Sequence, residues 1–304
     1  MINTFADCNS ITKLELGENV DYIGDYAFAN CNSLVSLVIP PATTTIGWCA
    51  FSGCYSLTSI IIPNSVTYIA DGAFQGCSGL TSISVEEGNS KYDSRNNCNA
   101  IIETLSNRLI AGCQNTKIPN SVSSIGYLSF CGSKLSSLVI PNCVTRLEDE
   151  SFLRCTLLSS INIPNSINSI GSYAFYGCSS LTNVTVMNET PVAIESNTFS
   201  NRTNATLYVP CGSKAAYHEA AFWKEFKEIV EIGDVNNDDY VNVTDIMAIA
   251  NYILKIPMNA FNERAADVNG DNRINVTDIM GIANIILKVP NTSRAGNVEG
   301  LEPQ

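Results

Sequence analysis

The sequence predicts an elongated, mainly β solenoid with one short strand in each 23-residue coil, followed by a small all-α domain of two loop–helix units. Three observations carry this prediction. Phenylalanine and cysteine recur at a 23-residue interval, Ile-Pro pairs close successive short apolar segments, and residues 234–257 align without gaps with residues 267–290. A fixed interval of this kind is typical of a repeat protein. With 304 residues, 45% of them apolar, the chain is long enough for two domains and can bury a core in at least one of them.

Each predicted coil reads Ala-Phe-x-x-Cys-x-x-Leu-x-x-Leu/Ile-x-Ile-Pro, then a polar stretch and Ile-Gly. Its phenylalanines are Phe28, Phe51 and Phe74, then Phe152 and Phe175, with Phe130 one residue out of phase and Phe199 last. Side chains alternate along a strand, so Ile60 and Ile62 face one side while Ser59 and Ile61 face the other. Burying one side requires coils stacked about 4.8 Å apart, with phenylalanine and cysteine lining the interior. Proline after each strand stops it from lengthening, because proline cannot donate to the ladder.

The twelve cysteines follow the same interval. Cys8, Cys31, Cys54 and Cys77 are 23 residues apart, and Cys155 and Cys178 repeat this spacing. Neither zinc sites nor small disulfide-stapled domains space their cysteines in this way. We therefore expect a buried column of free thiols that pack as small apolar groups. Cys98 and Cys113 lie outside the column, and the sequence leaves open whether they pair or simply pack.

The interval breaks once, between Phe74 and Phe130, which are 56 rather than 46 residues apart. The extra residues begin near Asn89. Two alternating segments, 100–105 and 108–111, are joined by a polar Ser-Asn pair and predict a β-hairpin in place of an ordinary coil, within about residues 89–113.

The two ends of the repeat array differ. Phe5 and Cys8 already occupy repeat positions, so the chain is expected to start inside a coil, as a fragment or with a misassigned start would. At the other end, Leu207-Tyr-Val-Pro210 predicts a last strand. Residues 212–232 then predict an amphipathic helix that caps the final coil.

The repeat unit, the Asn-Ala-Ile-Ile-Glu-Thr stretch at 99–104 and the Leu-Tyr-Val-Pro closure resemble the bacterial surface-protein-A-like (BspA-like) leucine-rich-repeat family over residues 1–232. The resemblance implies a leucine-rich-repeat solenoid with an irregular convex side over residues 1–211, and a C-terminal capping helix over 212–232. It also implies a surface or secreted bacterial protein, because members of this family are typically found there and some bind host proteins.

Past Gly233, the duplicated segments share 17 of 24 residues and place oxygen-bearing side chains at loop positions 1, 3, 5, 9 and 12, with a main-chain carbonyl at 7. This is the donor pattern with which EF-hand-like loops bind Ca²⁺ through six to eight oxygens, whereas Mg²⁺ demands tighter octahedral geometry. The sequence predicts two Ca²⁺ ions. The ligands in the first loop are Asp234, Asn236, Asp238, Asn242, Asp245 and the carbonyl of Tyr240; in the second they are Asp267, Asn269, Asp271, Asn275, Asp278 and the carbonyl of Arg273.

Two departures from the EF-hand pattern stand out. Position 6 is Asp239 or Asn272 rather than glycine, and both residue types tolerate the left-handed backbone of the turn, at some expected loss of affinity. Position 12 is aspartate rather than glutamate. Each loop runs directly into a helix with apolar spacing that ends at Pro257 or Pro290, and no clear second helix pairs with either loop.

A loop–helix unit duplicated once resembles the type I dockerin family over residues 233–290, with a flexible tail expected over 291–304. The resemblance implies a small all-α dockerin domain with two EF-hand-like units that binds a cohesin domain. The resemblance also implies that loop positions 10 and 11 determine which cohesin is bound. These positions are Val243 and Thr244 in one copy and Val276 and Thr277 in the other. Because both copies agree, either is expected to present the same face to the partner.

Charge and composition exclude several functions. A formal net charge of −12 with only 17 Lys and Arg argues against nucleic acid and anionic membrane as partners, and no apolar run approaches a membrane span. His218 is the only histidine, and the paired acids at 86–87 and 148–150 are expected in solvated turns rather than in a glycosidase site. We therefore expect no catalytic residues and no enzyme.

The sequence thus favours a non-catalytic, extracellular or cell-surface scaffold protein. Its dockerin-like part would bind Ca²⁺ and a cohesin in a cell-surface or multi-enzyme assembly, such as one that degrades polysaccharide. Its solenoid would display a protein-binding surface. The alternative is a cell-surface adhesin that binds host or bacterial proteins, with calcium loops that serve stability only. The outward strand positions that would bind a solenoid ligand are Lys13, Glu15, Ser36, Val38, Ser59, Ile61, Ser82, Ser84, Ser137, Val139, Ser160, Asn162, Asn183 and Thr185. They lack the aromatic and arginine anchors of binding hot spots, and no signal peptide is visible in this chain.

Overall fold

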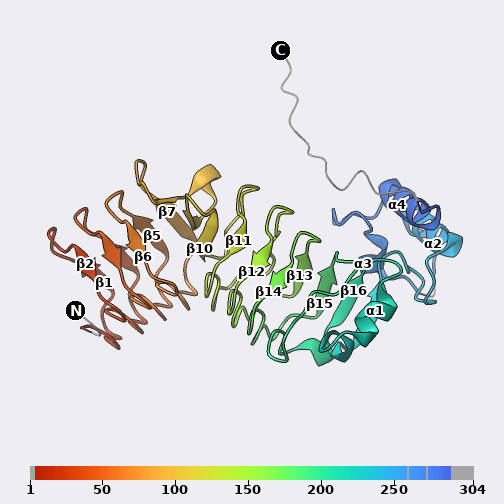
Figure 1. Ribbon diagram of the computed structural model, residues 1–304, viewed down its shortest axis with the longest axis horizontal. Coiled ribbons are helices and arrows are strands. Elements are labelled where there is room, and N and C mark those ends of the chain that lie inside the picture. Colours follow the sequence, from red (N-terminus) through yellow and green to blue (C-terminus); the bar gives the residue numbers. More distant parts are fainter. Residues whose placement is uncertain (1–3, 259, 272, 289–304) are drawn as a thin grey trace, which may run out of the picture.

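The computed structural model describes residues 4–258, 260–271 and 273–288. Figure 1 shows an elongated solenoid that runs from the N-terminus to the short helix α1 (Lys214–Glu219), with helices α2 (Val243–Ile253) and α4 (Val276–Ile286) beyond that end. This is the predicted order of a solenoid followed by a small helical domain. The expected tail over 291–304 lies outside the described residues, as do Asn272 and Pro290.

Two parallel ladders run along the solenoid, so a coil can contribute two short strands where the sequence predicted one. Each ladder stacks equivalent segments of successive coils. The first contains the strands that close each coil: β1 (Lys13–Glu15), β3 (Ser36–Val38), β5 (Ser59–Ile62), β7 (Ser82–Val85), β13 (Ser160–Ile163), β15 (Asn183–Val186), β16 (Thr206–Val209) and β17 (Glu228–Glu231). Pairing joins β1 to β3, β5 to β7, and β13 through β15 and β16 to β17. Equivalent residues face each other, as Ser59 faces Ser82 across one 23-residue period.

The second ladder contains two-residue strands: β2 (Tyr22–Ile23), β4 (Thr45–Ile46), β6 (Tyr68–Ile69), β11 (Ser124–Ile125), β12 (Arg146–Leu147) and β14 (Ser169–Ile170). Between the halves of this ladder lie β8 (Tyr92–Asp93), the 3₁₀ turn η1 (Arg95–Asn97), β9 (Ala100–Glu103) and β10 (Arg108–Gly112). Strands β9 and β10 are antiparallel, which confirms the predicted hairpin. The segments before Pro119 and Pro141, expected as strands, are not regular strands; they lie next to the hairpin, where the first ladder is interrupted.

The interior is lined by the predicted columns. Stacked rings join Phe28 to Phe51 at 5.5 Å between centroids and Phe152 to Phe175 at 5.1 Å. The buried thiol of Cys54 donates a hydrogen bond to the carbonyl oxygen of Phe28 at 3.3 Å. Equivalent bonds are made by Cys31, Cys77, Cys155 and Cys178, whereas Cys8 is only partly buried. The cysteines therefore pack and also satisfy a backbone acceptor. Cys98 and Cys113 are both buried free thiols.

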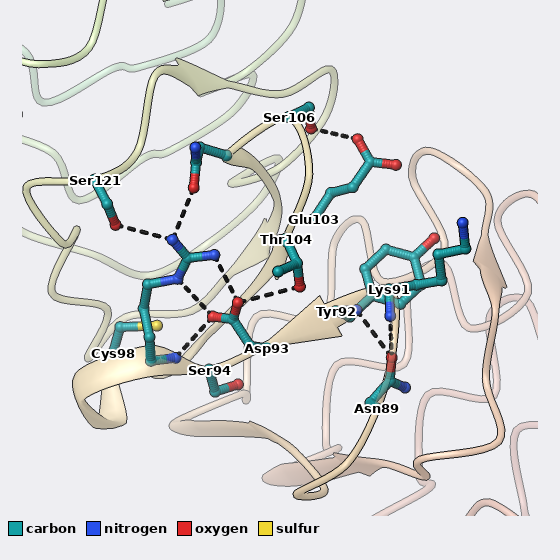
Figure 2. Close-up of polar contacts among 12 residues, drawn as sticks. Asn89, Lys91, Tyr92, Asp93, Ser94, Cys98, Glu103, Thr104, Ser106 and Ser121 are labelled. Carbon is teal, nitrogen blue, oxygen red and sulfur yellow. Dashed lines mark hydrogen bonds and ion pairs between the residues drawn. The ribbon is translucent and has the colours of Figure 1, made fainter.

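A polar network fixes the hairpin to the turn before it. The guanidinium of Arg95 donates to both carboxylate oxygens of Asp93, at 2.7 and 2.6 Å, and to the side-chain oxygen of Asn107 at 2.7 Å. Figure 2 shows Asp93 also receiving a hydrogen bond from Thr104, at 3.2 Å. Since the donors and acceptors are paired with one another, this cluster ties β8, η1 and the hairpin together rather than presenting free polar groups.

The C-terminal end of the solenoid differs from the prediction. The helix expected over 212–232 is confined to α1, and it is followed by a 3₁₀ turn, η3 (Trp223–Glu225), and by β17, which pairs in parallel with β16. A second 3₁₀ turn, η2 (Arg202–Asn204), precedes β16. The apolar residues of this segment therefore serve two roles. Tyr217, Trp223 and Phe226 close the core beside Phe199, while 228–231 extend the sheet by one strand.

Candidate functional site

The first predicted calcium loop is closed by the carboxylate of Asp245. Its Oδ1 accepts the backbone N–H of Val235 at 2.7 Å and of Asn236 at 3.2 Å, and its Oδ2 accepts the N–H of Asn242 at 2.9 Å. Asn242 in turn caps the start of α2 and forms a capping box with Asp245. One carboxylate therefore joins the start of the loop to the start of its helix.

The opening residue Asp234 organises the middle of the same loop. Its two carboxylate oxygens accept the N–H groups of Asp238 at 3.0 Å and Asp239 at 3.1 Å. Asp239, which replaces the usual glycine, has a φ of +67°, so the left-handed turn expected at position 6 is present. The turn thus survives the substitution.

The second loop repeats this geometry. Asp278 Oδ1 accepts the N–H of Val268 at 3.0 Å, its Oδ2 accepts that of Asn275 at 2.9 Å, and Asp267 Oδ1 accepts that of Asp271 at 3.0 Å. Asn275 caps α4 with the same capping box. The short helix α3 (Glu263–Ala266) leads directly into this loop. The duplication in sequence is therefore a duplication in structure.

The electrostatics of the first loop suit a cation. Asp234 is 2% exposed and Asp245 is fully buried. Burial raises the pKa of Asp234, and the neighbouring carboxylates of Asp245 and Asp238 raise it further. A divalent ion held among these oxygens would relieve the repulsion. The oxygen-only donor set of each loop fits calcium better than a transition metal, which prefers nitrogen or sulfur.

No group of three or more His, Cys, Asp and Glu side chains capable of holding a metal occurs within the described residues. Half of the predicted donors in the first loop are of other kinds, namely the amide oxygens of Asn236 and Asn242 and the main-chain carbonyl of Tyr240. The carboxylates of Asp234 and Asp245 accept backbone N–H groups of the loop.

The predicted partner-binding residues lie on the exposed faces of the two helix starts. Val243 is 61% exposed and Val276 is 62% exposed. The hydroxyl oxygen of Thr244 accepts a hydrogen bond from the side-chain amide of Asn236 at 2.8 Å, and Thr277 accepts one from Asn269 at 2.9 Å. In each copy, a predicted metal ligand therefore contacts a predicted docking residue.

The sequence interpretation missed part of this surface. Met247 and Met280 belong to the apolar spacing that predicts the two helices, yet they are 62% and 63% exposed. Each lies one turn after Val243 or Val276, on the same helix face, because residues four apart are neighbours. The i, i+4 spacing from the valines was the signal that could have identified them. We call Val243, Thr244 and Met247, with Val276, Thr277 and Met280, the two docking faces.

The outward strand positions of the solenoid are exposed in some coils and covered in others. Those of the early coils are open, with Val38 at 65% and Ile61 at 57% exposure. Asn162 and Thr185, expected to be available to a ligand, are instead in contact with Arg264 of α3. That prediction was wrong because strand alternation cannot show that a later segment of the chain covers the outward side.

One expectation about charged turns also needs correction. Glu148, predicted as a solvated carboxylate, receives two hydrogen bonds from Arg108, at 2.9 and 2.7 Å. Arg108 also pairs with Asp71 at 2.8 Å. The acid is therefore neutralised by a structural ion pair, and an acid and a base are not set apart here as a glycosidase requires.

Comparison with known families agrees with this architecture. A model of the BspA-type leucine-rich-repeat region matches residues 2–107 and 97–206, and a model of the type I dockerin domain matches residues 232–287. Both are typically non-catalytic interaction modules of extracellular or surface proteins. No curated protein matches the chain. Within the described residues, we find no helix with the length and apolar character needed to cross a membrane.

Solved structures of leucine-rich-repeat proteins share the solenoid fold. A leucine-rich cell surface protein from Faecalibacterium prausnitzii is similar with a TM-score of 0.60 and 25% identity, over 74% of this chain and 61% of that one. A leucine-rich-repeat protein from Eubacterium ventriosum has a TM-score of 0.56 and 23% identity, over 76% of this chain and 69% of that one. This chain thus spans less than two thirds of the first relative. The chain belongs to the BspA-type leucine-rich-repeat family and carries a C-terminal type I dockerin domain.

Proposed function

We propose that this chain is a non-catalytic extracellular interaction protein whose dockerin binds two calcium ions and docks onto a cohesin. The solenoid displays a protein-binding surface next to that anchor. The cohesin would belong to a cell-surface or multi-enzyme assembly, and a link to polysaccharide degradation would come through the enzymes of such an assembly.

The contact between metal ligand and docking face is the observation that carries this proposal. In both loops, the asparagine at position 3 donates to the threonine at position 11. An ion that fixes the asparagine oxygen also fixes its amide group and hence the threonine at the helix start. Calcium binding would therefore order the two docking faces, as metal binding commonly orders small domains.

A second candidate function rests on the open coils. Val38, Ile61 and Val139 are exposed on the outward side of the solenoid, at 65%, 57% and 79%. An adhesin could bind a host or bacterial protein there, with the calcium loops serving stability only. The two functions differ in what the dockerin does, so its calcium-dependent partner distinguishes them.

The test is capture of the full chain on immobilised cohesins of each class, with calcium or with a chelator, together with calorimetric titration of calcium. We expect two bound ions and capture only with calcium. Asp245→Ala and Asp278→Ala should each remove one ion, since position 12 closes the loop. The matched control is Asp239→Asn, which removes a charge from the first loop at a position predicted not to bind the ion.

Asp239→Asn should retain both ions. If calcium binds but no cohesin retains the chain, the adhesin function is favoured and the docking proposal fails. If calcium produces neither heat nor a rise in melting temperature, the calcium assignment fails as well.

A further inference from the structure

The dockerin follows the solenoid without a spacer. The N–H of Ile232, directly after β17, donates to Val209 of β16 at 2.8 Å. The next N–H, of Gly233, donates to Ala265 of α3 at 2.9 Å, and Asp234 is already the first predicted metal ligand. Consecutive residues therefore belong to the solenoid sheet, the dockerin core and the calcium loop.

The dockerin also covers one row of the solenoid sheet. Asn162, Thr185, Tyr208 and Val230 face one another in register across β13, β15, β16 and β17. We call these four residues the outward row. Their side chains point away from the solenoid core, and Tyr208 and Val230 are nonetheless only 7% and 4% exposed.

Polar contacts hold the first half of the outward row. The Arg264 guanidinium donates to the side-chain oxygen of Asn162, and to the hydroxyl of Thr185 from Nη2 at 3.1 Å and from Nε at 3.3 Å. Arg264 lies in α3, directly before the second calcium loop. The charged fork of one arginine thus spans two strands of the solenoid.

Apolar contacts hold the second half. Tyr208 and Val230 share one buried cluster with dockerin residues of both loop–helix units, among them Val235, Ala248, Ile249, Ala265, Ala266, Val268 and Ile282. A separate ion pair joins Lys214 of α1 to Asp239 of the first loop. The core of the dockerin is therefore completed by the solenoid, and its shape depends on the loops that calcium would order.

We propose that calcium locks the dockerin onto the outward row, so that solenoid and dockerin act as one rigid body, and that loss of calcium releases the row. This inference rests on the proposed calcium binding. It adds a fixed geometry: the anchored partner would set the direction in which the solenoid projects. Both docking faces stay exposed in the locked state, so a partner can bind without breaking the contact.

Oxidative footprinting of the full chain tests the lock, because Tyr208 reports on the outward row. Two other tyrosines calibrate it: Tyr22, at 45% exposure, should always react, and Tyr217, at 1% exposure in the solenoid core, should never react. With calcium, Tyr208 should be as protected as Tyr217. With chelator, its oxidation should rise several-fold while Tyr217 stays protected.

Two variants separate the effect of the Arg264 contact from the effect of calcium. Arg264→Ala should raise Tyr208 oxidation in the presence of calcium. Arg146→Ala removes an exposed arginine of β12, in the middle of the solenoid (Figure 1), and should leave Tyr208 oxidation unchanged. Calorimetry on the same samples measures calcium binding independently.

If calcium binds but its removal does not change Tyr208 oxidation, the proposed lock is wrong and the proposed function is unaffected. Simultaneous exposure of Tyr217 would also overturn the lock, because the solenoid end would then be unfolding rather than releasing a docked domain. Absence of calcium binding would remove the proposed function itself.

Discussion

Arg108 links parts of the chain that no local pattern connects. Its guanidinium reaches Asp71 from the coil before the hairpin and Glu148 from a coil after it. Burial raises the pKa of Glu148, but the hydrogen bonds and charge of Arg108 outweigh burial, so the net pKa lies below the ordinary value. The pair therefore stabilises the fold across the point where the repeat is interrupted.

This pair predicts a pH dependence of stability. A carboxyl with a lowered pKa in the folded state contributes stability that is present above its unfolded pKa and is lost as the pH falls through the folded pKa. Glu148→Gln should lower the free energy of unfolding by about 1–2 kcal/mol near neutral pH, and the difference from wild type should vanish in acid. Urea unfolding across pH 3–7 measures it, with the exposed acid variant Glu87→Gln as control. A constant difference at all pH values would contradict the ion-pair account.

At the scale of elements, the sequence predicted the repeating core and the hairpin that interrupts it, but not the contacts made by the last part of the chain. The columns of Phe51 and Cys54 were predictable because each coil buries its own copies against identical neighbours. The strand at 228–231 was not, because its apolar residues fit a helix or a strand and pairing with β16 decides between them. The docking of Arg264 on Thr185 joins residues 79 apart in the chain and follows from no spacing.

Stacked coils predict a local effect of core mutations. Phe152 is fully buried and stacks on Phe130 and Phe175. Phe152→Ala should destabilise by about 3–5 kcal/mol, through lost burial and the cavity left behind. Because each coil contacts only its neighbours, hydrogen exchange should accelerate in the coils around residues 130–175 and much less before residue 74. Leu157→Ala, at a half-exposed position of the same region, should leave exchange unchanged. Uniform acceleration along the solenoid would show that it unfolds as a single unit.

At the scale of the whole molecule, the solenoid has two buried cores rather than one. The first contains residues from Ile23 to Cys113, and the second contains residues from Cys98 to Ile229. The hairpin belongs to both, since Ile101 and Ile110 pack into the first core while Ile102 and Leu109 pack into the second. Alternation along its strands turns one hairpin into the joint between the halves. With the dockerin covering the last strands, the described part of the chain forms a series of three buried clusters.

The division of the solenoid into two cores can be tested by making the same substitution at two adjacent isoleucines of β9. Ile101 and Ile102 are both fully buried, so replacing either with alanine should cost about 2–5 kcal/mol. The location of the damage should differ, because their side chains enter opposite cores. Hydrogen exchange should increase mainly before residue 100 in Ile101→Ala and mainly after residue 113 in Ile102→Ala. Identical exchange maps for the two variants would mean that the hairpin transmits the loss to both sides, and the solenoid would then be one cooperative unit despite its divided core.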